Sequence, residues 1–202
     1  MEPKLAAAVI HDLNNALGMV EGGLAQMMDG PDAGRAEDLH RTTARLRSRL
    51  AGFLTLYRAE SQGLEARVED CSPGDFLEDL VSALLPQAGS ALITTRVDEG
   101  VPPVWFFDRR LVSLALEEAI RNAQREGTRH IEVSACADRG QLVFSVADDG
   151  PGPGAGSDSG STGLGLSLCR VIAAAHRLGN CSGDAVLLPG PTGGALFRLT
   201  LP

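Results

Sequence analysis

Apolar residues near the N-terminus recur with the spacing of packed helices. They fall every third or fourth position, at Ile10, Leu13, Leu17, Val20, Leu24 and Met27. Turn-forming residues interrupt the pattern at 29–32, and it then resumes at Ala36, Leu39, Thr43, Leu46, Leu50, Phe53 and Tyr57. This spacing is that of an apolar seam between helices, so it predicts two antiparallel helices joined by a short turn.

A single helical hairpin leaves its apolar seam in water. Pairing two hairpins into a four-helix bundle is the simplest way to bury that seam, so we expect a homodimer. The alternative is that the hairpin folds back on the rest of its own chain. A molecular mass in solution close to that of one chain would favour this alternative.

The pattern changes after Gly63 to a mixture of short strands and helices. Strands are predicted at 64–70, 92–97, 104–107, 131–137, 141–147, 185–188 and 195–201. The strands 131–137 and 141–147 are expected to meet at a tight turn over 138–140. Helices are predicted at 72–84, with Ser72 as N-cap and Pro73 as first helical position, at 109–126, with Asp108 as cap, and at 163–178. Because the strands do not alternate regularly with the helices, we expect an α+β two-layer sandwich following the hairpin. The predicted domains are therefore 1–62 and 63–202.

Composition narrows the class of protein. The formal net charge is −8 and the basic residues are scattered, which argues against nucleic acid or an anionic membrane as the main partner. No stretch approaches the roughly 18 uninterrupted apolar residues of a membrane-spanning helix. The four cysteines form no C-x-x-C pair and have no histidine at zinc-ligand spacing. We therefore expect reduced thiols and a cytoplasmic protein.

His11 is the first candidate for chemistry. It follows the seam residue Ile10, about 100° further around the helix, and should be exposed, as a phosphoacceptor must be. Asp12 can draw a proton from the imidazole, and Asn15 lies one turn further along the same face. A histidine beside an aspartate is also common on a solvated helix face, and these residues alone leave that interpretation open.

The predicted helix 109–126 carries a second polar group. Glu118 and Asn122 are four residues apart, so they project from one face, and Arg125 follows them. A carboxamide oxygen suits Mg²⁺ and a guanidinium suits phosphate, so this face is typical of a nucleotide pocket. An amphipathic helix with an ordinary polar side explains the same spacing.

Two glycine clusters follow. Asp148 ends a strand and precedes Gly150 and Gly152, which places a carboxylate beside a backbone that a ligand can approach closely. Gly163 and Gly165 open a helix, where free backbone N–H groups favour phosphate. Either cluster alone can be a simple turn.

In their order and spacing, these motifs resemble those of sensor histidine kinases. The corresponding segments are 11–15 for the H box, 118–123 for the N box, 148–152 and 163–166 for the two glycine boxes, and 193–202 for the closing strand. The resemblance spans nearly the whole chain. It implies that 1–62 is a dimerisation and histidine phosphotransfer hairpin and that 63–202 is a catalytic domain of the Bergerat type that binds ATP.

The resemblance also implies roles for single residues. Asp148 would accept the adenine amino group, Asn122 would hold Mg²⁺, and Glu118 would help to position the attacking group or a metal-bound water. The pocket walls and the phosphate end would be shaped by the glycines Gly150, Gly152, Gly163 and Gly165.

The activity implied is autophosphorylation of His11 from Mg-ATP, followed by transfer to an aspartate of a response-regulator receiver domain. Asp12 and Asn15 resemble the D-x-x-N signature of kinases that also dephosphorylate their partner, with Asn15 orienting a water. One alternative is a phosphotransferase that relays phosphate between receiver domains through His11 without ATP. A more distant one is a serine kinase or a non-signalling ATPase.

The chain departs from the family pattern in two ways. The lid between Gly152 and Gly163 is short and has no box containing phenylalanine, so we expect loosely held nucleotide. No PAS, HAMP or receiver module is recognisable, so input is expected from a separate sensory protein or from a domain outside this chain. The other histidines, His40, His130 and His176, are expected to have structural or surface roles. The arginines Arg41, Arg45 and Arg49 are expected to be solvated, and docking of an acidic response regulator is the alternative for them.

Overall fold

The computed structural model describes residues 3–28, 30, 32–85, 91–125, 128–153, 164–191 and 193–202, without the side chains of 3–12 and 125. None of the helices among the described residues combines the length and the hydrophobicity that a membrane-spanning segment needs. The chain divides into two compact units, Met1–Gly63 and Leu64–Pro202.

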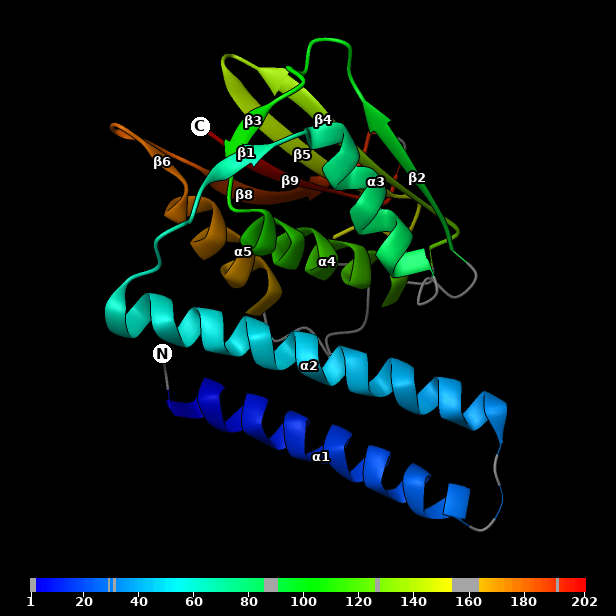
Figure 1. The fold of residues 1–202 in the computed structure, drawn as a ribbon. Helices are drawn as coiled ribbons and strands as arrows, with labels where there is room; N and C mark the ends of the chain where they lie inside the picture. The colour runs from blue at the N-terminus through cyan, green and yellow to red at the C-terminus, as the bar shows by residue number, and fades with distance from the viewer. Residues whose placement is uncertain are drawn as a thin grey trace. The chain divides into compact units, whose positions relative to one another are not determined.

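The first unit is an antiparallel pair of helices, α1 (Pro3–Met28) and α2 (Ala33–Gln62) (Figure 1). Gly23 packs closely against α2, because an added Cβ there would fall 2.4 Å from Cδ2 of Leu39. Within one chain the predicted seam is only partly covered, because Leu17 is 46% and Leu24 is 53% exposed. The predicted hairpin is confirmed.

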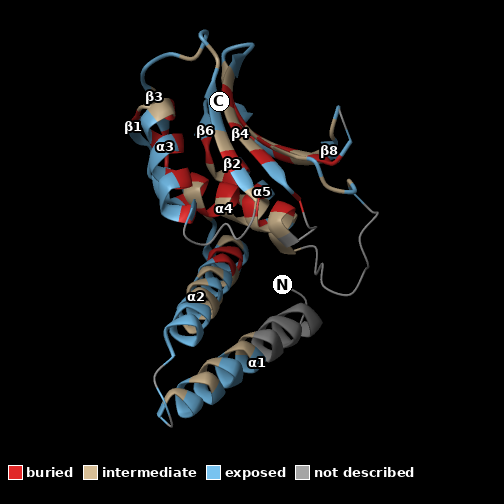
Figure 2. Ribbon diagram, turned by 90° about the vertical axis from the view of Figure 1, so that its right-hand side faces the viewer, coloured by how far each residue is buried: buried red, intermediate tan, exposed pale blue. Residues whose placement is uncertain are grey.

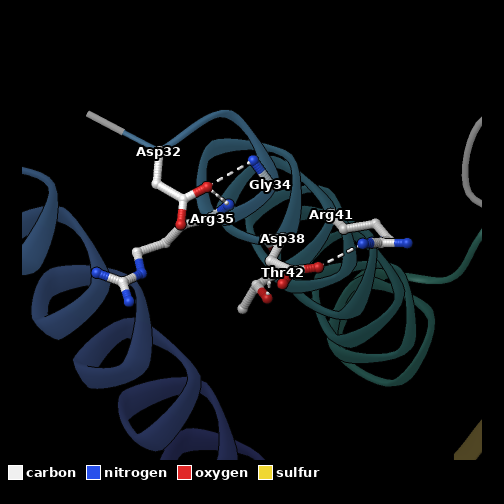
Figure 3. Close-up of polar contacts among 6 residues, drawn as sticks. All are labelled: Asp32, Gly34, Arg35, Asp38, Arg41 and Thr42. Carbon is white, nitrogen blue, oxygen red and sulfur yellow. Dashed lines mark hydrogen bonds and ion pairs between the residues drawn. The ribbon is translucent and has the colours of Figure 1, made fainter. Parts of the chain in front are cut away.

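Helix α2 begins at a side-chain cap. Oδ1 of Asp32 accepts hydrogen bonds from the backbone N–H groups of Gly34, at 2.9 Å, and Arg35, at 3.3 Å (Figure 3). These are two of the N–H groups that have no partner inside a helix. One turn further on, Arg41 pairs with Asp38 on the solvent side of the helix.

The second unit is built on a five-stranded sheet with the strand order β2-β4-β5-β9-β8. These strands are β2 (Leu92–Val97), β4 (His130–Asp138), β5 (Gln141–Asp148), β8 (Asp184–Pro189) and β9 (Ala195–Leu201). β2 runs parallel to β4, and the other neighbours are antiparallel. Two short pairs stand apart from this sheet, β1 (Glu69–Cys71) with β3 (Trp105–Phe107) and β6 (Arg177–Leu178) with β7 (Cys181–Ser182).

Three helices cover one face of this sheet, as Figures 1 and 2 show: α3 (Pro73–Leu84), α4 (Arg109–Arg125) and α5 (Leu164–Ala175). Buried residues gather where the helices meet the sheet. At the centre, the rings of Phe76, Phe107 and Phe144 meet edge to face with centroids 5.1 to 5.5 Å apart. On the other face the sheet residues are mostly half-buried, so the unit is the predicted two-layer sandwich.

The predicted helix starts of α3 and α4 are confirmed. Ser72 caps α3 by accepting the N–H of Asp75 at 3.3 Å, with Pro73 in the first turn. Asp108 caps α4, where its Oδ1 accepts the N–H of Leu111 at 2.9 Å. The predicted tight turn between β4 and β5 is also present, and both of its central residues, Arg139 and Gly140, have positive φ, as in a type I′ hairpin turn.

Two predicted boundaries are wrong. The helix predicted at 163–178 ends at Ala175, because the chain turns at Gly179, which has φ +57°, and forms the β6–β7 hairpin that was not predicted. The strand predicted at 64–70 is shorter and later, at Glu69–Cys71, because β3 offers only three residues for it to pair with.

Candidate functional site

Asp148 is the last residue of β5 and its carboxylate is held through one oxygen. Oδ1 accepts the N–H of Gly150 at 2.9 Å and the N–H of Ala195, from β9, at 3.1 Å. Among the described residues none donates to Oδ2, and the side chain is half-buried. The backbone therefore fixes the direction of Asp148 and leaves one oxygen to accept a donor from a ligand.

Glycines pack their backbones directly against Asp148. Gly194 has φ +72°, and a Cβ there would lie 1.9 Å from the carbonyl oxygen of Asp148. Gly152, at φ +86°, would place a Cβ 3.0 Å from the carbonyl oxygen of Gly194, which in turn accepts the N–H of Gly190 at 2.9 Å. The roles of Gly190 and Gly194 were not predicted, although the double glycine before β9 was a signal for a close approach of two chains.

The neighbouring carboxylate, Asp149, binds a different part of the backbone. Its Oδ1 accepts the N–H groups of His130, at 3.1 Å, and Arg129, at 2.8 Å, at the start of β4. These hydrogen bonds lower the pKa of the exposed Asp149 carboxyl, and the bond from His130 has the larger effect. Asp149 therefore anchors the start of β4, and Asp148 is the carboxylate that belongs to the candidate site.

Helix α4 presents Glu118 and Asn122, both half-buried, one turn apart. Between them, Arg121 contacts Oε2 of Glu118 through Nη2 at 3.1 Å and Oε2 of Glu117 through Nη1 at 3.2 Å. The other oxygen of Glu118 faces α5, where a Cβ on Gly165 would lie 2.8 Å from Oε1. The structure thus brings Glu118 and Gly165 together, and it adds Arg121, which the sequence did not single out.

A buried thiol joins α4 to α5 beside this group. The Sγ–H of Cys169 donates to the carbonyl oxygen of Ala115 at 3.5 Å. Burial raises the pKa of Cys169 to about 12, and the negative charge of Glu118 adds to that effect. The thiol is therefore protonated at neutral pH and acts as a packing residue.

His176 joins the same two helices at their other end. Its Nδ1 lies 2.8 Å from the carbonyl oxygen of Ile172 and must carry the proton, so its Nε2 accepts the N–H of Asp108 at 3.0 Å. Burial lowers the pKa of His176. The helix predicted over 163–178 would place His176 in its last turn, but His176 lies just beyond α5. It is a neutral buried residue with the structural role that was expected.

The remaining predicted residues belong to the first unit or lie outside the described residues. Asn15 is exposed on α1 in the first unit. The side chains of His11, Asp12 and Arg125, and all of Gly163, lie outside the described residues, as does the predicted lid from 154 onward.

The oxygen atoms of Glu118 and Asn122 suit Mg²⁺, which prefers hard oxygen ligands. Among the described residues no group of three or more His, Cys, Asp or Glu side chains is placed to hold a metal. A Mg²⁺ ion on α4 would therefore need phosphate and water oxygens to complete its coordination. This is the usual manner of binding Mg²⁺ together with a nucleotide.

Comparisons with known proteins agree with the fold of the second unit. Residues 107–202 match the family model described as histidine kinase-, DNA gyrase B-, and HSP90-like ATPase. No curated protein matches the chain by sequence.

Several solved structures share the fold. The Acinetobacter baumannii histidine kinase AdeS is 22% identical with a TM-score of 0.68, over 95% of this chain and 96% of that one. The cytoplasmic segment of the histidine kinase QseC is 21% identical with a TM-score of 0.58, over 77% of this chain and 94% of that one. The histidine kinase ThkA, solved in complex with the response regulator protein TrrA, is 16% identical with a TM-score of 0.65, over 99% of this chain and 61% of that one.

Proposed function

We propose that this chain, whose residues 107–202 form an ATPase domain of the histidine kinase, DNA gyrase B and HSP90 type, is the catalytic core of a histidine protein kinase. Residues 63–202 would be the catalytic domain, and 1–62 the dimerisation and phosphotransfer hairpin. The observation that carries the proposal is the Asp148 carboxylate, which is fixed through one oxygen against a close-packed glycine backbone. A purine amino group can donate to its second oxygen.

In the proposed reaction a ring nitrogen of His11 attacks the γ-phosphorus of ATP. The bond between that phosphorus and the β,γ-bridging oxygen breaks, ADP leaves, and Asp12 accepts the imidazole proton. Asn122 would offer an amide oxygen to Mg²⁺, which neutralises charge on the phosphates when bound. Glu118 would orient the attacking group, and Gly165 at the start of α5 would let the phosphates approach the backbone.

In the second proposed step the phosphoryl group passes to an aspartate of a response-regulator receiver domain. The fold shared with ThkA, which was solved in complex with the response regulator TrrA, supports this partner. Homodimerisation through the hairpin is supported by seam residues that one chain leaves exposed, such as Leu17 and Leu24. We propose a cytoplasmic location and sensory input from a separate protein or domain.

Phosphatase activity toward the phosphorylated partner is a further part of the proposal. Asn15 is exposed on α1, as a residue that orients a water must be. Asn15→Ala should slow the decay of the phosphorylated partner while His11 is still phosphorylated. Unchanged decay would remove this activity from the proposal.

Labelling with γ-labelled ATP tests the kinase directly. The wild-type chain should acquire label that is stable to alkali and labile to acid, and His11→Ala and Asn122→Ala should not. Label that survives acid would favour a serine kinase. No label, together with no change in melting temperature in millimolar Mg-ATP, would favour the ATP-independent relay, because a bound ligand at about 100 times its Kd adds roughly 2.7 kcal/mol of stability.

A further inference from the structure

Arg121 occupies a central place on the α4 face. It stands one residue before Asn122, and its guanidinium contacts Glu117 and Glu118 through separate nitrogens. The three side chains are only 20%, 30% and 25% exposed for Arg121, Glu117 and Glu118. Solvent therefore screens these ion pairs less than it screens pairs on an open surface.

The two oxygens of Glu118 are constrained from opposite directions. Arg121 contacts Oε2. Oε1 lies so close to Gly165 that a side chain at that position would collide with it. The buried Cys169, one turn further along α5, closes the space beside them. A rotation of the Glu118 carboxylate would have to break the contact with Arg121.

We propose that Arg121 is a positioning residue that holds Glu118 in its orientation toward the second glycine cluster; this inference rests on the proposed kinase function. A planar fork with several donors can bind two carboxylates at once, whereas a lysine ammonium offers a point charge.

The effect of Arg121 should appear in the chemical step. Glu118 is placed to orient the attacking group, so its misalignment should lower kcat and leave KM for Mg-ATP nearly unchanged. A displacement of about 1 Å at a reacting centre lowers rates by roughly 100-fold. We therefore expect Arg121→Gln to lower kcat for autophosphorylation by about 10- to 100-fold, and Arg121→Lys to lower it less.

A double-mutant cycle on the full chain separates positioning from general stability. If Arg121 acts through Glu118, then Arg121→Gln should have little further effect in a Glu118→Gln background. A merely structural Arg121 would lower activity by the same factor in both backgrounds. Arg110→Gln is the matched control, because it removes an exposed arginine from the same helix and should retain wild-type kcat.

Several outcomes would overturn the inference. These are wild-type kcat in Arg121→Gln, an equal loss in both backgrounds, or a raised KM with unchanged kcat, which would make Arg121 a direct nucleotide ligand. If Arg121→Gln does not fold, Arg121→Lys and its double mutant with Glu118→Gln carry the same test. A wild-type chain that neither binds Mg-ATP nor acquires label would instead refute the kinase proposal, and the inference would fall with it.

Discussion

Replacing His176 by glutamine should flatten the dependence of stability on pH in the unit Leu64–Pro202. The imidazole is 1% exposed and accepts the N–H of Asp108, which only its neutral form can do. A protonated ring would place an N–H against that donor, and the nearby Asp108 carboxylate offsets only part of the cost. Burial accordingly lowers the pKa of His176 from its ordinary value of 6.5.

The sign and size of the effect follow from proton linkage. Above about pH 6.5 both the folded and unfolded states hold a neutral His176, and its contribution to stability is complete. Below that pH the unfolded state binds a proton that the folded state does not. The free energy of unfolding therefore falls by up to about 1.4 kcal/mol per pH unit until the pH reaches the lowered pKa of the folded state.

Urea titrations at constant ionic strength measure this difference. The chain has one tryptophan, Trp105, whose Nε1–H donates to the carbonyl oxygen of Pro202 at 3.2 Å, so its fluorescence reports on this unit. His176→Gln keeps an acceptor for the N–H of Asp108, costs about 1–2 kcal/mol at neutral pH and should have the flatter profile. His40→Gln, which removes an exposed imidazole from α2, should keep the wild-type slope. Parallel profiles for wild type and His176→Gln below about pH 6.5 would refute the reasoning.

Three further predictions follow from single contacts. Gly194→Ala forces a side chain into a backbone with φ +72°, so it should destabilise its unit by at least about 1–3 kcal/mol in the urea titration. Gly100→Ala is the control, because open space surrounds Gly100, and it should not destabilise the unit. The exposed Cys181 should react with a thiol reagent at about pH 8 long before Cys169, whose pKa is raised to about 12, and equal rates in the folded protein would contradict that value. Asp32→Ala removes the cap of α2 and should cost about 0.5–2 kcal/mol in melting followed by helical circular dichroism, with Asp32→Asn losing less.

Local signals were sufficient to predict much of the fold. Asp108 and Ser72 were read as helix caps because their side chains bond N–H groups only three positions away. The β4–β5 turn was predicted because Gly140 supplies a positive φ at low cost. Each of these features depends on neighbours in sequence, which a pattern can display.

The features that were missed depend on partners distant in the chain. The hydrogen bond from Asp108 to His176 joins residues 68 positions apart, and no spacing rule reveals it. Asp148 and Asp149 are adjacent in sequence, yet one faces a glycine backbone brought by β9 and the other caps the start of β4. Arg125 was selected from the sequence and Arg121 was not. The spacing of residues does not show that Glu117 and Glu118 share the guanidinium of Arg121, and only the packed structure does.

The place of β9 in the sheet bears on synthesis of the protein. β9 follows β8 in sequence, yet it lies inside the sheet, between β5 and β8. Until β9 has emerged from the ribosome, β5 keeps a free edge of apolar residues and β8 has no partner strand. A nascent chain in this condition offers a template for pairing with other chains, so expression with a chaperone present should favour soluble product.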